Sequence, residues 1–207
     1  MPRRKSKCLL QDSELHQDLV NYATKGKVAK VKQCIRDGVA VNKVLPESPG
    51  YNVLFMVIMS DPFTHDHLKV MEVLIANGAD VSNRAWIQET QQYTSLLHLA
   101  CSKQNVSALD LLIKSGAEIN FNSLPLLHMA VHQNSLKMTQ ALLKHKLMRN
   151  KIDYKSKDCD DATALHYALK CGYNDIALLL IESGANVNAK DEEELYVIHA
   201  AAAKGNN

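Results

Sequence analysis

The stretch TALHYALKCGYNDIALLLIESGANVNAKD, residues 163–191, carries the pattern that decides the fold. Thr163 can cap a helix through its hydroxyl, and the apolar residues after it recur at helical spacing until Gly172. A second apolar helix is expected from Asn174, and Gly184 stands where a helix end favours a left-handed residue. Neither helix is long enough to be stable alone. The stretch therefore predicts two short helices that must pack on neighbours.

Similar stretches occur along most of the chain. Residues 95–120 and 125–146 match the pattern position by position, residues 19–42 and 54–82 match it more loosely, and residues 196–207 match its first half. Four histidines share one position, which we call the histidine slot: His98, His128, His166 and His199. The second helices end at Gly38, Gly78, Gly116, Lys146 and Gly184. A two-helix unit that recurs every 30 to 40 residues or so indicates a stacked repeat array.

The shared pattern, T-x-L-H-x-A followed by a second helix and G-A-x-V-N, resembles the ankyrin repeat. The resemblance covers residues 15–207 and is closest over 158–190. It implies an all-α ankyrin-repeat solenoid with about five helix-turn-helix repeats and a terminal half repeat. We expect a basic, flexible tail at 1–13 and a repeat domain at 14–207, with repeats at about 14–45, 50–82, 93–120, 123–153, 158–190 and, in part, 191–207. Lys146 replaces a helix-ending glycine, and we expect a rebuilt loop there.

Composition narrows the cellular setting. The chain has 207 residues, and no run of about 18 apolar residues predicts a membrane span. Its five cysteines lack metal-type spacing, which favours reduced thiols and a cytoplasmic or nuclear location. Basic residues gather near the N-terminus, where a short basic run can serve nuclear import or contact phosphates. The more common interpretation of such a run is a solvated tail and helix face.

The histidines do not indicate a catalytic or metal site. The resemblance implies that the slot histidines hydrogen-bond adjoining loops. His98 and Cys101 share a helix face, but no oxyanion site or orienting group accompanies them, so packing is the preferred interpretation. His65 and His67, near two aspartates, form only a weak metal pattern. We expect no enzyme activity in this segment, no cofactor, and no tight metal at any histidine.

The resemblance implies that partner contacts come from the finger loops and the inner helices. The residue that follows the histidine slot, or the matching position of an earlier repeat, is Met56, Leu99, Met129 or Tyr167. These side chains would form an apolar stripe on the inner face, or would instead pack between repeats. Polar positions that follow on the inner helices are Lys103, Gln133 and Lys170. The long finger at 83–94 carries Trp86 and Ile87. An aromatic side chain on an exposed loop is a typical interface anchor, whereas the alternative is that Trp86 folds back over a neighbouring repeat.

These observations favour a monomeric protein–protein interaction module that binds a partner protein or peptide in its concave groove and fingers. One alternative is the targeting or substrate-recognition module of a larger enzyme, ligase or bacterial effector. Another, less favoured, is nucleic-acid or nucleotide binding through the basic N-terminal repeat. Because the last repeat lacks its second helix, we expect the natural protein to continue beyond Asn207. The competing interpretation is that the helix at 196–204 is itself the cap.

Overall fold

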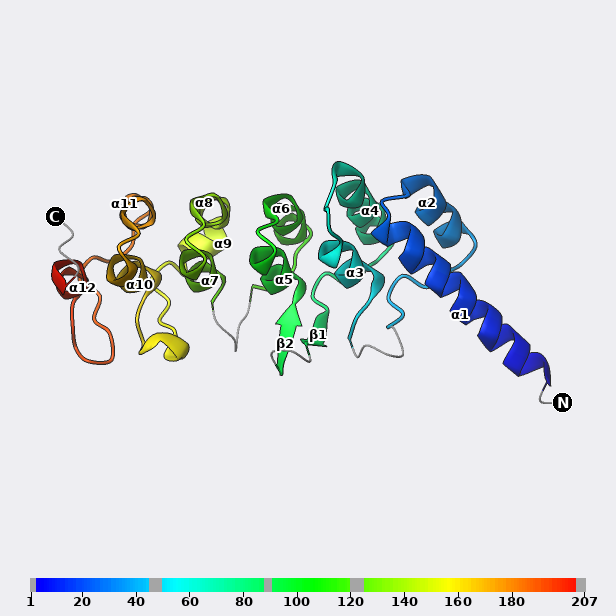
Figure 1. Cartoon of the computed structure of the whole chain (residues 1–207), viewed down its shortest axis with the longest axis horizontal. Helices are drawn as coiled ribbons and strands as arrows, with labels where there is room; N and C mark the ends of the chain where they lie inside the picture. Colours follow the sequence, from blue (N-terminus) through cyan, green and yellow to red (C-terminus); the bar gives the residue numbers. More distant parts are fainter. Residues whose placement is uncertain (1–2, 45–49, 88–90, 120–124, 204–207) are drawn as a thin grey trace. The chain divides into compact units, whose positions relative to one another are not determined.

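The structure, a computed structural model, describes residues 3–44, 50–87, 91–119 and 125–203. These residues form short paired helices and one two-stranded hairpin (Figure 1). Contacts divide the chain into two compact units, the first at residues 1–103 and 107–118, and the second at 104–106 and 119–207. Each unit contains its own stack of helix pairs.

The first unit contains three helix pairs and the hairpin. In chain order its elements are α1 (Arg3–Thr24), α2 (Val28–Arg36), α3 (Val53–Met59), α4 (His65–Ala76), β1 (Arg84–Ile87), β2 (Gln92–Ser95), α5 (Leu96–Ser102) and α6 (Val106–Lys114). α1 packs on α2 and α3, α2 packs on α4, and α3 packs on α4 and α5. α1 begins inside the segment 1–13 that we expected to be a tail, and the flexibility of that segment stays a prediction.

Local sequence explains where these helices begin. The Asn52 side chain accepts a hydrogen bond from the Phe55 amide at 2.9 Å and so caps α3. Ser95 does the same for α5, accepting from the His98 amide at 3.3 Å. Such caps satisfy backbone donors that the first turn of a helix leaves without partners. The apolar faces then close on one another, and Leu54, Phe55 and Leu74 become fully buried.

The second unit repeats the same arrangement. Its elements are α7 (Leu126–His132), α8 (Leu136–Lys144), α9 (Lys146–Arg149), a 3₁₀ turn η1 (Lys157–Cys159), α10 (Ala164–Cys171), α11 (Asn174–Glu182) and α12 (Val197–Ala203). α7 packs on α8 and α10, and α10 packs on α11 and α12. The loop around Lys146 is rebuilt as expected, since Lys146 starts the short helix α9 and Met148 of that helix is buried.

The expected fold class is confirmed. The described residues contain five helix pairs, the short extra helix α9 and the final single helix α12, and their only sheet is the hairpin β1–β2. The limits given for the individual repeats stay predictions. Among the described residues, no helix is both long and apolar enough to cross a membrane.

Candidate partner-binding site

The hairpin finger of the first unit displays a pair of aromatic side chains. β1 and β2 are antiparallel, and their register places Trp86 opposite Tyr93. The two ring centroids lie 5.1 Å apart with the planes at 67°, an edge-to-face contact. Trp86 is 37% exposed and Tyr93 64% exposed, whereas the neighbouring Ala85 is fully buried. The strand alternation therefore turns the aromatic pair outward.

The base of this hairpin is fixed to the preceding loop. The Asn83 side-chain amide donates to the carbonyl of Gly50 at 2.7 Å. Gly50 has φ +87°, and a Cβ there would lie 2.5 Å from the Arg84 carbonyl oxygen. Only glycine allows this close approach of two backbone segments. Because Ser95 both ends β2 and caps α5, the hairpin is held at each of its two strands.

The structure places the other predicted residues of the first unit in differing environments. Ile87 and Met56 are half-buried and Lys103 is exposed. Leu99 is 6% exposed and packs in the core, which matches the alternative interpretation for that position. Partner binding by Leu99 stays a prediction, and the burial of this side chain argues against it. Tyr93 was missed from the sequence, although its strand-like alternation in QYTS could have paired it with Trp86.

A second aromatic contact lies on the first helices of the second unit. Tyr167 of α10 is half-buried and stacks on His132 of α7, with ring centroids 5.7 Å apart and planes at 20°. Met129 and Gln133 are half-buried and Lys170 is exposed. Burial, followed by the contact with Cys171, raises the pKa of the Tyr167 hydroxyl. Sequence reasoning missed His132, although it lies three residues after Met129 and so shares its helix face.

Two slot histidines, His128 and His166, connect a helix start to the next finger. His128 Nε2 donates to the Ala162 carbonyl at 2.9 Å, and His166 Nε2 donates to the Leu195 carbonyl at 3.4 Å. On the other side of the ring, His166 Nδ1 lies 2.9 Å from the Thr163 hydroxyl, and His98 Nδ1 lies 2.8 Å from the Ser95 hydroxyl. The expected hydrogen bonds to adjoining loops are thus confirmed for His128 and His166.

Neither the metal pattern nor the cysteine–histidine pair forms a reactive site. His67 caps α4, with Nδ1 2.7 Å from the Thr64 hydroxyl, and its Nε2 donates to the Thr24 carbonyl at 2.9 Å. The described residues hold no group of three side chains suited to a metal ion. Burial raises the pKa of Cys101 to about 12, so this residue is a thiol rather than a nucleophilic thiolate at neutral pH.

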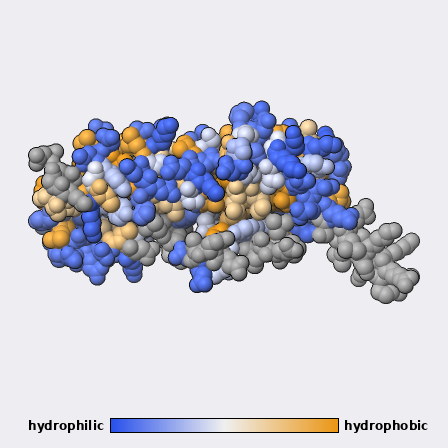
Figure 2. Space-filling view, viewed as in Figure 1, coloured by the Kyte–Doolittle hydropathy of each residue, from blue (hydrophilic) through white to orange (hydrophobic). Residues whose placement is uncertain are grey.

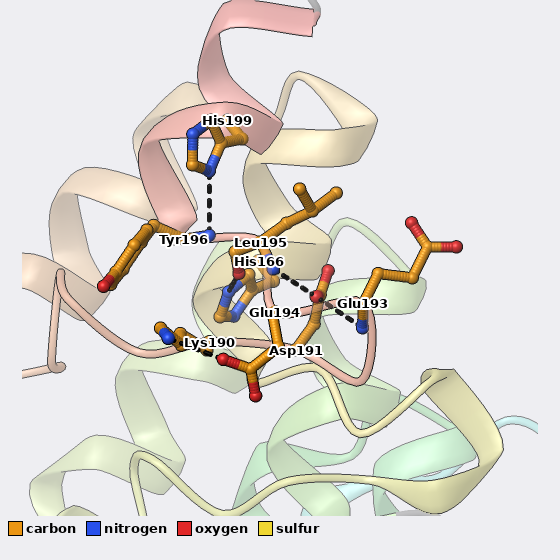
Figure 3. A network of polar contacts seen from close by, with 8 residues as sticks. All are labelled: His166, Lys190, Asp191, Glu193, Glu194, Leu195, Tyr196 and His199. Carbon is orange, nitrogen blue, oxygen red and sulfur yellow. Dashed lines mark hydrogen bonds and ion pairs between the residues drawn. The ribbon is translucent and has the colours of Figure 1, made fainter.

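The last finger of the second unit is held by its own polar side chains (Figure 3). Asp191 accepts from the backbone amides of Glu193 at 3.0 Å and Leu195 at 2.9 Å. Lys190 pairs with Glu194, and its ammonium lies 5.1 Å from the centroid of the Tyr196 ring. The ion pair lowers the pKa of Glu194 and raises that of Lys190. This finger is thus a defined, largely acidic surface.

Comparison with known proteins agrees with this geometry. The family model for ankyrin repeats in three copies matches residues 97–191. A chain in the crystal structure of the ankyrin repeat protein EF0377 superimposes with a TM-score of 0.70 at 23% identity, covering 92% of this chain and 93% of that one. The chain has the ankyrin-repeat fold, and residues 97–191 match the ankyrin-repeat family. Another match is a chain in the complex of the predatory endopeptidase Bd0816 from Bdellovibrio bacteriovorus with the immunity protein Bd3460, with a TM-score of 0.67, 19% identity, and coverage of 91% and 92%.

Much longer proteins also match a large part of this chain in sequence. Alpha-latroinsectotoxin-Lt1a from Latrodectus tredecimguttatus is 29% identical over 143 residues, which is 68% of this chain. The chain spans only about 10% of the length of that relative. Ankyrin repeats are generally protein-interaction scaffolds rather than catalytic domains, and such arrays present extended binding surfaces.

Proposed function

We propose that this chain binds a partner protein through the hairpin finger of its first unit, with Trp86 and Tyr93 as the anchoring side chains. The observation that carries the proposal is the outward-facing aromatic pair on a hairpin fixed at its base. Tryptophan and tyrosine are enriched among the residues that contribute most to binding energy at protein interfaces. A solvent-exposed tryptophan gains more from burial against a partner than from remaining in water.

The rigidity of the hairpin supports the same proposal. Binding costs free energy when a loop must be ordered, and a surface that is already ordered avoids most of that cost. The Gly50 contact and the Ser95 cap fix both strands before any partner arrives. The partner is either an extended peptide or a folded surface with an apolar pocket for the indole ring.

Affinity capture from a cell extract tests the proposal. The bait is the chain itself, compared with the double variant Trp86→Ala/Tyr93→Ala and with Tyr154→Ala, an exposed aromatic of the second unit, as the matched control. We expect discrete proteins to be captured by the wild type and the control, and to be lost from the double variant. Circular dichroism verifies that all three baits are folded.

The fluorescence of the chain supplies a direct readout, because Trp86 is its only tryptophan. A captured protein that binds the hairpin should shift the Trp86 emission to shorter wavelength as the indole leaves water. A protein that binds the double variant as tightly as the wild type, or that leaves the emission unchanged, would contradict the proposal.

A further inference from the structure

A second surface of the first unit lies between α2 and α4, away from the hairpin. The turn between α1 and α2 is fixed against the start of α4, because His67 Nε2 donates to the Thr24 carbonyl at 2.9 Å. Gly26 in this turn has φ +66°, and a Cβ there would lie 3.2 Å from the Asp66 Cβ. These contacts hold the N-terminal ends of α2 and α4 side by side.

Two open hollows follow the seam between these helices, and we call them together the α2/α4 groove. The first, of about 530 Å³, is lined near the helix starts by residues that include Lys27, Lys30, Asp66 and Lys69. The second, of about 460 Å³, is lined further along by residues that include Ile35, Arg36, Glu72 and Val73. Lys32 borders both hollows. Hydrophilic side chains cover this region on the face drawn in Figure 2.

The charge of the groove is unbalanced. Its walls carry five cations and two carboxylates. Lys69 pairs with Asp66 at 3.6 Å, whereas Lys27, Lys30 and Lys32 are exposed and have no ion-pair partner among the described residues. Lys32 and Arg36 lie one helical turn apart, and like charges at that spacing destabilise a helix. An anionic partner would relieve this repulsion.

The position of α2 in the first helix pair explains only part of this pattern. A helix pair whose outer side no other pair covers among the described residues needs a polar outer face, and Lys30 occupies the position that Val70 and Ala108 fill, fully buried, in the next two repeats. An exposed outer face must be polar, but its charged residues need not all be positive. At the position equivalent to Lys32, the next two repeats have Glu72 and Asp110. The excess of lysines therefore goes beyond what a cap requires.

We propose that the α2/α4 groove binds an acidic peptide segment of a partner protein. The lysines along its walls complement carboxylates, and the half-buried Ile35 and Val73 offer apolar contacts to side chains between those carboxylates. A nucleic acid fits less well, because it carries a phosphate at every nucleotide, whereas a peptide can place neutral residues opposite Asp66 and Glu72. The residues that line the two hollows also include no aromatic ring on which a base could stack.

Fluorescence anisotropy with a labelled peptide that repeats Glu-Glu-Leu tests the proposal. The variant is Lys27→Glu/Lys32→Glu, and the matched control is Lys137→Glu/Lys144→Glu, which reverses two exposed charges on α8 of the second unit. We expect the groove variant to weaken binding about tenfold or more, since two attractive contacts become repulsive. The control should change the affinity by about twofold or less, and a Gln-Gln-Leu peptide should not bind.

Further measurements distinguish the groove from the hairpin, and an acidic peptide from a nucleic acid. Trp86→Ala should leave the affinity for the acidic peptide unchanged, because the groove does not include the hairpin. Equal binding by the groove variant and the wild type would overturn the proposal, as would equal losses in the groove and control variants. A single-stranded oligonucleotide that binds the wild type more tightly than the peptide, and that the groove variant no longer binds, would also overturn it and assign the groove to nucleic acid.

Discussion

Pro125 stands at the N-cap of α7, where α5 has Ser95 and α10 has Thr163. Proline supplies neither a hydroxyl nor a backbone N–H, and the buried His128 Nδ1 has no hydrogen-bond partner among the described residues. In α10, by contrast, the Thr163 hydroxyl lies 2.9 Å from His166 Nδ1. A buried polar atom without a partner costs free energy.

Pro125→Thr should therefore stabilise the protein. The helix cap and the hydrogen bond to His128 Nδ1 should together raise the free energy of unfolding by about 1 to 2 kcal/mol. The loss of the rigid proline ring should lower it by about 0.5 kcal/mol. Urea unfolding measures the change, and Pro125→Ala, which removes the ring without adding a hydroxyl, is the control. A Thr variant no more stable than the Ala variant would show that the hydroxyl does not reach the imidazole.

The buried His128 also makes stability depend on pH. Burial lowers its pKa, with partial opposition from the hydrogen bond to Ala162. Below pH 6.5 the unfolded chain therefore binds a proton that the folded chain does not, so the free energy of unfolding falls with decreasing pH until the folded-state pKa is reached. The slope is at most about 1.4 kcal/mol per pH unit for this group.

Melting temperatures between pH 7.5 and 5.5 measure this dependence. His128→Gln keeps an amide donor for the Ala162 carbonyl but cannot titrate, so its melting temperature should fall less on acidification. Burial also lowers the pKa of His16, which should leave a residual slope in that variant. Identical slopes in the wild type and the variant would exclude His128 as a source of the effect.

The hairpin depends on Gly50 beneath its first strand. Gly50→Ala forces a side chain into a left-handed backbone and against the Arg84 carbonyl, which should cost about 2 to 3 kcal/mol of stability. Gly38→Ala is the matched control, because Gly38 has φ +88° but no atom within 4 Å of the added Cβ. The control should cost only about 1 kcal/mol.

Chemical unfolding and Trp86 fluorescence separate the two variants. Gly50→Ala should also change the Trp86 emission in the native state, because the strand that carries Trp86 must shift. Equal losses of stability in both variants, with unchanged emission, would mean that the loop moves away from β1 at little cost.

The helices and the finger differ in how far the sequence predicts them. Inner helix pairs have similar neighbours, so His98, His128 and His166 each lie in the first turn of a helix, and the pattern predicts that placement. The Trp86–Tyr93 pair depends on the cross-strand register of a single finger, which no repeat encodes. Burial of Leu99 follows from the packing around α5, and the α2/α4 groove exists only once two helices meet. The sequence therefore predicts features that several repeats share, and it misses contacts that occur only once in the chain.

A repeat array derives its stability from each unit and from the interfaces between neighbours, so the same position can matter greatly in one repeat and little in another. The leucine or isoleucine just before the histidine slot shows this contrast. Leu165 is 1% exposed, with α11 and α12 packed around α10, whereas Ile198 of α12 is 67% exposed. No further helix follows α12 among the described residues.

Two equivalent substitutions should consequently have very different effects. Leu165→Ser should cost about 3 kcal/mol or more, because it leaves a cavity and buries a hydroxyl. Ile198→Ser should change stability by about 0.5 kcal/mol or less, as substitutions at exposed positions usually do. Urea unfolding at several protein concentrations measures both. If Ile198→Ser proves as costly as Leu165→Ser, the open face of α12 is covered in solution, and a midpoint that rises with protein concentration would identify a second copy of the chain as its cover.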